Sequence, residues 1–165
     1  MGFIFDSTAV PKAMINDLFS AFARLPQRVI FKYDIQEDLL PTPEGKYGSK
    51  SGLSVPSNVL VLPWVPQQAI LAHPDTRVFI THCGMHGVLE AIYHEVGHCQ
   101  LTSAQVPMVG MPVFIDQMDV VKRMEETGIG LRVSKEAPGD EILSAIEQVS
   151  HHPTIGGYYP MVVKT

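Results

Sequence analysis

A short apolar run, followed by two glycines and a helix-like stretch, constrains the fold of this 165-residue chain more than any other feature. Residues 77–81 (Arg-Val-Phe-Ile-Thr) have the length and the β-branched content of a buried strand. Gly84 and Gly87 then allow a sharp turn into residues 88–93, whose apolar content favours a helix. Because this unit recurs in α/β proteins, we predict a parallel sheet flanked by helices.

The rest of the chain alternates strand and helix signals in the same way. Residues 34–57 break the alternation, because their prolines, glycines, serines and charges show little periodicity and indicate a surface loop. Strands joined by helices imply parallel pairing, and ligands of such sheets bind beyond the carboxyl ends of the strands. The expected strands are 2–5, 28–32, 58–62, 108–114 and 129–133, and the expected helices are 13–22, 67–72, 88–95, 118–126 (ended by Gly128) and 140–149.

The residues around the glycine turn have the chemistry of a nucleotide-sugar site. Backbone N–H groups at the start of a helix point outward, where a diphosphate can accept their hydrogen bonds. The Trp64 indole offers a flat face to a base, the Gln67 amide suits the edge of the base, and the acceptor-only Glu90 suits ribose hydroxyls. Trp64, His82 and Asp116 each follow an expected strand, so we expect them at the ligand-binding edge of the sheet.

The spacing of Trp64, His82 and Glu90, together with the later pair Asp116-Gln117, resembles the signature of the UDP-glycosyltransferase family, which includes the animal UDP-glucuronosyltransferases. The likeness extends from about residue 2 to residue 149. It implies the second of the two Rossmann-like domains in the arrangement called GT-B. We therefore expect one UDP-sugar-binding domain over residues 1–150 and a divergent tail over residues 151–165.

The resemblance also implies which residues contact the nucleoside and the sugar. Trp64 would stack on uracil, Gln67 would contact the base or the ribose, and Glu90 would hold the ribose. Asp116 and Gln117 would bind the sugar hydroxyls. Without the resemblance, a simpler interpretation is that Asp116 is the N-cap of the following helix and that Gln117 faces solvent.

The diphosphate would be held at the glycine turn. The resemblance assigns it to His82 and to the amides near Gly84 and Gly87. His86 stands where relatives often carry Asn, which alters the side-chain part of phosphate binding and leaves the backbone part intact. A helix start that carries no side-chain charge can still bind an anion through its N–H groups.

The family moves a hexosyl or glucuronosyl group from UDP to a small lipophilic acceptor and inverts the anomeric centre. The resemblance therefore implies a transferase of the hexosyltransferase class, with UDP-sugar as the donor substrate and no separate cofactor. The family's general base is a histidine in the other half, which this sequence lacks, so we expect donor binding with little turnover. A non-catalytic fragment that binds a nucleotide or a partner protein is the alternative.

Residues 96–105 depart from the family pattern. They lengthen the interval between Glu90 and Asp116, and their removal would restore the family spacing. The segment begins with a residue whose codons start with GT and ends with one that CAG encodes, which suggests a retained in-frame intron or a gene-model error. Its polar residues predict a protruding loop. Sequencing the transcript tests the hypothesis, and a transcript that carries the segment in every tissue would contradict it.

A rival motif overlaps this segment, because residues 94–98 read His-Glu-Val-Gly-His and match the zinc-binding pattern H-E-x-x-H. On a helix, His94 and His98 would bind zinc while Glu95 activated a water molecule, as in metallopeptidases. Gly97 weakens that helix, and Leu101 stands where the metzincin continuation needs glycine. A zinc metallopeptidase is therefore a remote alternative, and we expect no metal in the site.

Composition excludes some partners and leaves localisation open. The net charge of −5 argues against nucleic acid and anionic membrane surfaces, which favour a basic face. No apolar run approaches the roughly 20 residues that span a bilayer, and the amino end lacks the basic start of a secretory signal. Full-length animal relatives are membrane proteins of the endoplasmic reticulum, but this sequence shows neither signal peptide nor anchor. Cys83 and Cys99 are expected to be free buried thiols.

Overall fold

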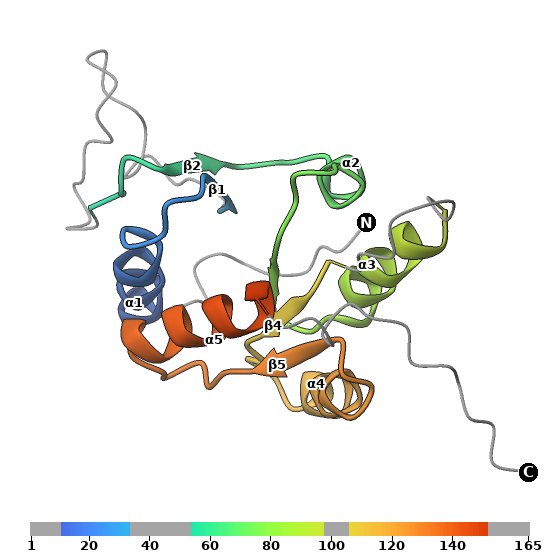
Figure 1. The fold of residues 1–165 in the computed structure, drawn as a ribbon. Helices are drawn as coiled ribbons and strands as arrows, with labels where there is room; N and C mark the ends of the chain where they lie inside the picture. The colour runs from blue at the N-terminus through green and yellow to red at the C-terminus, as the bar shows by residue number, and fades with distance from the viewer. Residues whose placement is uncertain (1–10, 34–53, 98–105, 152–165) are drawn as a thin grey trace, which may run out of the picture. The chain divides into compact units, whose positions relative to one another are not determined.

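The fold is described from a computed structural model of the chain, which describes residues 11–33, 54–97 and 106–151. From residue 59 onward, strands and helices alternate along it, as predicted (Figure 1). In chain order the elements are α1 (Lys12–Phe22), β1 (Val29–Lys32), β2 (Val59–Leu62), α2 (Gln67–Leu71), β3 (Phe79–Thr81), α3 (Met85–Gly97), β4 (Met108–Gly110), α4 (Asp116–Glu126), β5 (Gly130–Arg132) and α5 (Gly139–His151).

The described chain divides into two compact units, which are treated separately below. The C-terminal unit comprises residues 67–134 and 145–151. The N-terminal unit comprises the described residues up to position 66, together with residues 135–144. The prediction of one domain over residues 1–150 concerns both units at once, and it stays a prediction.

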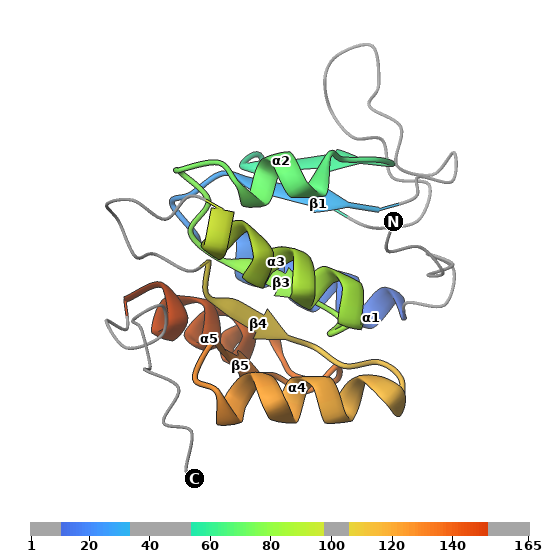
Figure 2. The ribbon, with the colours of Figure 1, turned by 90° about the vertical axis from the view of Figure 1, so that its right-hand side faces the viewer.

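The C-terminal unit is built on a three-stranded parallel sheet with the strand order β3-β4-β5. Phe79 pairs with Met108, and Met108 pairs with Gly130. The connection from β3 to β4 contains α3, and α4 connects β4 to β5. These two helices lie on the same side of the sheet (Figure 2). The predicted parallel α/β arrangement is therefore confirmed.

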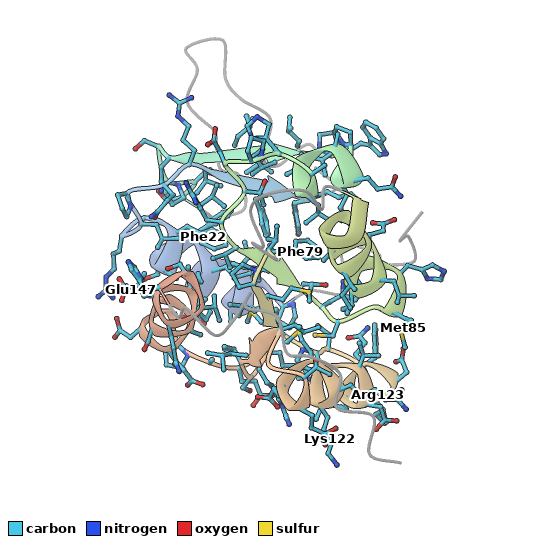
Figure 3. The ribbon with its side chains drawn as sticks, turned by 45° about the vertical axis from the view of Figure 1, so that its right-hand side comes forward. Phe22, Phe79, Met85, Lys122, Arg123 and Glu147 are labelled. Atoms are coloured by element: carbon cyan, nitrogen blue, oxygen red, sulfur yellow. The ribbon has the colours of Figure 1, made fainter. Side chains whose placement is uncertain are left out.

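The hydrophobic core of the C-terminal unit lies between this sheet and its two helices. The central strand β4 is buried along its whole length, as expected for a strand that is covered by neighbours on both sides. Phe79, Ile92 and Ile129 pack against the edge of the core (Phe79 is labelled in Figure 3). Its buried members are Leu71, Cys83, Val88, Ala91, Met108, Val120, Val121 and Met124.

Helix α4 buries its valines and one methionine and exposes its charged residues, and Gln117 is its one buried polar residue. Val121 and Met124 are buried, whereas Lys122 and Arg123 point away from the sheet (Figure 3). The predicted stop, Gly128, lies just beyond the last residue of the helix, Glu126, and its φ of 70° is a left-handed conformation that glycine adopts without steric cost. This ending returns the chain at once to β5.

The N-terminal unit pairs β1 with β2 in parallel and packs α1 through its apolar face. The Phe31 ring of β1 meets Phe19 and Phe22 of α1 edge to face, with centroid distances of 5.5 and 6.2 Å. Aromatic rings favour this geometry because their edges are positive and their faces negative. These contacts seat the helix on the strand pair.

Asn58 closes the carboxyl end of α1. Its side-chain nitrogen lies 2.8 Å from the carbonyl oxygen of Phe22 and 3.0 Å from those of Leu25 and Gln27. The last carbonyls of a helix have no partner within it, so an amide donor from another segment stabilises the helix end. Asn58 also directly precedes β2, so the same side chain links α1 to the strand pair.

Two features of the structure correct the predicted boundaries. Helix α3 begins at Met85, three residues before the predicted start, and it runs on to Gly97. Val96 and Gly97 are therefore helical, and the predicted loop over residues 96–105 is wrong for these two; residues 98–105 lie outside the described residues. Strand β4 ends at Gly110, earlier than predicted, since Pro112 lacks the N–H that a longer central strand needs.

Several predictions fall on segments outside the described residues. They are the strand at residues 2–5, most of the loop at 34–57, the thiol of Cys99 and the tail after residue 151. None of the helices in the described ranges combines the length and the apolar character that crossing a membrane requires.

Gly130 provides a test of the strand pairing. A Cβ atom at this position would collide with the main-chain carbonyl oxygen of its register partner Met108, and a backbone atom cannot move aside as a flexible side chain can. We expect Gly130→Ala to lower the free energy of unfolding in urea by about 1–3 kcal/mol or more. Arg132→Ala, an exposed change in the same strand, is the control and should stay within about 0.5 kcal/mol of wild type. Equal midpoints for all three proteins would contradict the register.

Candidate functional site

The turn after β3 is unusually tight. Three residues, His82, Cys83 and Gly84, connect the end of β3 to the start of α3. Cys83 adopts a φ of 66°, a left-handed conformation that is rare outside glycine. Its main-chain N–H donates a hydrogen bond of 3.2 Å to the hydroxyl of Thr81, which holds the turn closed. The chain therefore passes from strand to helix at the carboxyl edge of the sheet, as predicted.

The Cys83 side chain anchors this turn in the core. It is fully buried and packs where Gly110 of β4 has no side chain, since a Cβ atom at Gly110 would lie 2.5 Å from the Cys83 sulfur. Burial, and to a lesser degree the negative charge of Glu125, raises the pKa of the thiol to about 11. The thiol thus stays protonated at neutral pH and is a packing group, which confirms the prediction for Cys83.

The start of α3 presents the predicted backbone donors. Val88 donates to the carbonyl oxygen of Gly84 at 3.2 Å, so the N–H groups of residues 85–87 precede the first hydrogen bond of the helix. The half-buried imidazole of His82 lies beside them, because a Cβ atom at Gly84 would approach its Nε2 to 2.5 Å. His86 is exposed on the first turn of the helix. The structure thereby brings the predicted diphosphate residues together.

Gly87 differs from Gly84 in the space around it. A Cβ atom at Gly87 would meet the Gln67 amide nitrogen and the Thr81 hydroxyl at 3.7 Å, which is ordinary van der Waals contact. A side chain is therefore excluded at Gly84 by the imidazole, whereas a methyl group fits at Gly87.

Glu90 is held by two consecutive glutamines of α2. Gln67 donates to one carboxylate oxygen at 2.7 Å, and Gln68 donates to the other at 3.4 Å. Partial burial acts to raise the pKa of Glu90, but the hydrogen bonds act in the opposite direction, and the pKa lies below its ordinary value. The carboxylate is therefore charged at neutral pH. The family signature includes Gln67, but nothing in the sequence pattern indicated that Gln68 also contacts Glu90.

The loop between β4 and α4 carries the predicted sugar-binding pair. Asp116 is exposed and is the first residue of α4; the N-cap is Ile115, and no side chain caps the helix, so the N-cap reading of Asp116 is wrong. Gln117 is only 4% exposed, so the solvent-facing reading is wrong as well. Its amide oxygen accepts hydrogen bonds from the N–H groups of Val113 at 2.8 Å and Phe114 at 3.1 Å. Contact of either residue with a sugar stays a prediction.

Trp64 belongs to the N-terminal unit, on the segment that follows β2. Its side chain is 66% exposed, which is unusual for an indole and leaves much of the ring open to a stacking partner. Stacking on a base stays a prediction for this residue.

The zinc motif receives no support from the described residues. His94 and Glu95 lie in α3, and His98 is outside the described ranges. Within the described part of the chain, no group of three or more histidine, cysteine, aspartate or glutamate side chains lies close enough to hold a metal ion.

Sequence comparison places this geometry in a family. The profile of the family described as "UDP-glucoronosyl and UDP-glucosyl transferase" matches residues 6–155. UDP-glucuronosyltransferase 2A3 of Pongo abelii is 34% identical over 151 residues, which cover 91% of this chain and 24% of the relative. The same-named protein of Homo sapiens is 35% identical and is also covered to 24%. The chain thus spans about a quarter of the length of the curated relatives that it matches.

Solved structures show the same fold. Os79 from O. sativa, in complex with UDP and deoxynivalenol-3-glucoside, superposes with a TM-score of 0.68 at 23% identity, over 93% of this chain and 32% of Os79. The glycotransferase of kitacinnamycin gives a TM-score of 0.65 at 26% identity, over 87% of this chain and 32% of that chain. The Rossmann-like half of a GT-B glycosyltransferase is therefore the fold of this chain. With a family profile that matches most of its length, the chain belongs to the UDP-glycosyltransferase family.

Proposed function

We propose that this chain binds a UDP-sugar and serves as the donor half of a UDP-glycosyltransferase. The observation that carries the proposal is the arrangement around α3, where the N–H groups that precede the first hydrogen bond of the helix lie at one end and a charged, pre-oriented carboxylate lies on the second turn. Helix-start N–H groups suit a diphosphate, and a carboxylate suits a pair of ribose hydroxyls. Complexes of Os79 with UDP support the same ligand class.

In this proposal His82 and the first amides of α3 stabilise the UDP leaving group. Negative charge grows on the diphosphate as the glycosidic bond breaks, and donors that are already aimed at that position lower the barrier without reorganising. Gly84 allows the imidazole to reach the helix start. Asp116, exposed at the start of α4, accepts hydrogen bonds from the sugar hydroxyls.

The reaction also needs a base that deprotonates a small lipophilic acceptor. The resemblance assigns that base to the other half of the enzyme, and this chain matches only 24% of the curated relatives. We therefore expect the isolated chain to bind its donor with little turnover. Inverting transfer of a hexosyl or glucuronosyl group is the reaction proposed for the complete enzyme.

A partner-binding fragment is a second candidate function. Phe114 is 50% and Ile115 is 91% exposed, and two neighbouring large apolar side chains at a site edge suit contact with another protein surface. Sugar transfer by the isolated chain would exclude this candidate. Transfer that appears only after another protein is added would support it.

Calorimetric titration with UDP tests the proposal directly. We expect saturable binding of UDP and no binding of the free sugar, because the base and the diphosphate supply most of the contacts. Trp64→Ala should weaken UDP binding by about 1–3 kcal/mol, the cost of removing a stacking face from a base. Trp64→Phe is the matched control, since it keeps an aromatic face. Unchanged affinity in the alanine variant would reject Trp64 as the platform.

Glu90→Gln tests the ribose contact. A neutral amide accepts a hydrogen bond more weakly than a carboxylate does, so discrimination between UDP and 2′-deoxy-UDP should fall by about 1 kcal/mol, or roughly fivefold. Asp119→Asn removes an exposed negative charge on α4 and controls for net charge. If Glu90→Gln and the control discriminate equally well, Glu90 does not contact the ribose.

Two glycine variants separate the imidazole from the backbone donors. Gly84→Ala should displace the His82 ring and weaken UDP binding about tenfold, the loss expected for one hydrogen bond to a charged group. Gly87→Ala keeps the same backbone N–H and fits its surroundings, so it should bind UDP as wild type does. Equal affinities for the two variants would show that the position of His82 is unimportant.

A further inference from the structure

A second glutamine of α2, Gln68, contacts the Glu90 carboxylate beside Gln67. The Gln67 amide nitrogen donates to Oε2 at 2.7 Å, and the Gln68 amide nitrogen donates to Oε1 at 3.4 Å. An ionised carboxylate only accepts hydrogen bonds, so both amides must turn their nitrogen atoms toward it, and the orientation of each is determined. Each oxygen of Glu90 therefore has its own donor from α2.

The main chains that carry these side chains are anchored in one hydrophobic core. Leu71 of α2 is buried in the same cluster as Val88, which lies two residues before Glu90 in α3. The two helices lie next to each other (Figure 2). The carbonyl oxygen of Gln68 also accepts the N–H of Ala72 at 2.9 Å, which fixes its main chain within the helical turn. Packing thus sets the separation of the two helices, and the rotation of the carboxylate is left to its hydrogen bonds.

One hydrogen bond does not fix the plane of a carboxylate. With Gln67 alone, the group would still rotate about the bond that joins it to the rest of the Glu90 side chain. A donor on each oxygen restricts this rotation, so the contact from Gln68 adds orientation that the shorter contact from Gln67 does not supply. Gln68 is exposed, and its side chain can be replaced without disturbing the core.

The orientation of both oxygens matters for a ligand with two neighbouring hydroxyl groups. The 2′- and 3′-hydroxyl groups of a ribose each donate one hydrogen bond, and a carboxylate with two oriented oxygens can accept both at once. A carboxylate that is held at one oxygen only must first lose rotational freedom, which weakens binding. The second donor therefore favours a ligand that carries both hydroxyl groups.

We propose that Gln68 is a positioning residue, which orients the second carboxylate oxygen of Glu90 and thereby increases the preference of the site for a ribonucleotide over a deoxyribonucleotide. The inference rests on the proposed function, because it takes Glu90 to be the group that meets the ribose. Gln68 acts through Glu90 and needs no contact of its own with the ligand. Gln67 is itself predicted to contact the nucleoside, so Gln68 is the position at which orientation can be separated from contact.

The pKa of Glu90 tests the contact in solution. Burial acts to raise this pKa, whereas the hydrogen bonds from Gln67 and Gln68 lower it, so removal of the Gln68 donor should raise it. Gln68→Met keeps the length of the side chain without the donor, and Gln68→Lys keeps N–H donors. Ala69→Met, at the next exposed position of α2, controls for the added methionine.

The pKa is read from the ¹³C shift of the Glu90 carboxyl group in an NMR titration of each protein. We expect a higher pKa in Gln68→Met than in wild type, and no rise in Gln68→Lys or in Ala69→Met. Equal pKa values in wild type and Gln68→Met would show that the contact is absent in solution and would overturn the inference.

Binding tests the positioning role. UDP and 2′-deoxy-UDP are titrated into wild type, Gln68→Met, Gln68→Lys, Glu90→Ala and the double variant of Glu90→Ala with Gln68→Met. We expect Gln68→Met to reduce the preference for UDP about threefold, as loss of one weak hydrogen bond predicts, and Gln68→Lys to keep the preference. Without the carboxylate, Gln68→Met should cause no further loss. An unchanged preference in Gln68→Met, or losses that add in the double variant, would overturn the positioning role.

The outcomes distinguish this inference from the proposed function. If wild type binds UDP no more tightly than 2′-deoxy-UDP, the positioning role is overturned while donor binding stands. If wild type does not bind UDP, the proposed function fails, and the positioning role fails with it. Should Gln68→Met not fold, Gln68→Glu decides, because a like charge beside Glu90 should raise its pKa and lower the preference for UDP. An unchanged preference in that variant would also overturn the inference.

Discussion

The close approach of Cys83 to Gly110 is the contact on which the rest of the candidate site depends. The left-handed turn at Cys83 places its thiol in the space that a side chain at Gly110 would occupy. Steric strain of this kind persists only where the surrounding packing compensates it, and the buried thiol is the compensating contact. Because the buried Cys83 thiol fixes the turn, His82 and the start of α3 occupy defined positions at the edge of the sheet.

Side-chain amides orient the polar groups that this edge presents. Gln67 and Gln68 hold Glu90 by its two carboxylate oxygens, and Gln117 holds the loop before α4. A group that is already ordered loses less conformational entropy when a ligand binds, so pre-orientation strengthens binding without adding a contact. Neutral amides suit this role, since they orient a carboxylate without cancelling its charge.

In the proposed function, the residues that bind the donor lie close together in the sequence. Stabilisation of the departing UDP would need helix-start donors and an imidazole, and in the proposed function these come from adjacent positions along β3 and α3. Proton removal from an acceptor needs a base on the opposite side of the reacting carbon. The chain matches about a quarter of the length of its curated relatives, and the proposal assigns it the donor-binding part of the chemistry.

The sequence by itself determined the alternation of strands and helices, the helix stop at Gly128 and the positions of the motif residues, because each depends on local periodicity, turn chemistry or spacing. Only the tertiary structure decided that Cys83 turns left-handed against Gly110, since those residues meet across two strands and no local pattern encodes the contact. It also decided that Gln117 is buried rather than solvent-facing. A glutamine after an aspartate suits either environment, and the packing of α4 on the sheet selects the buried one.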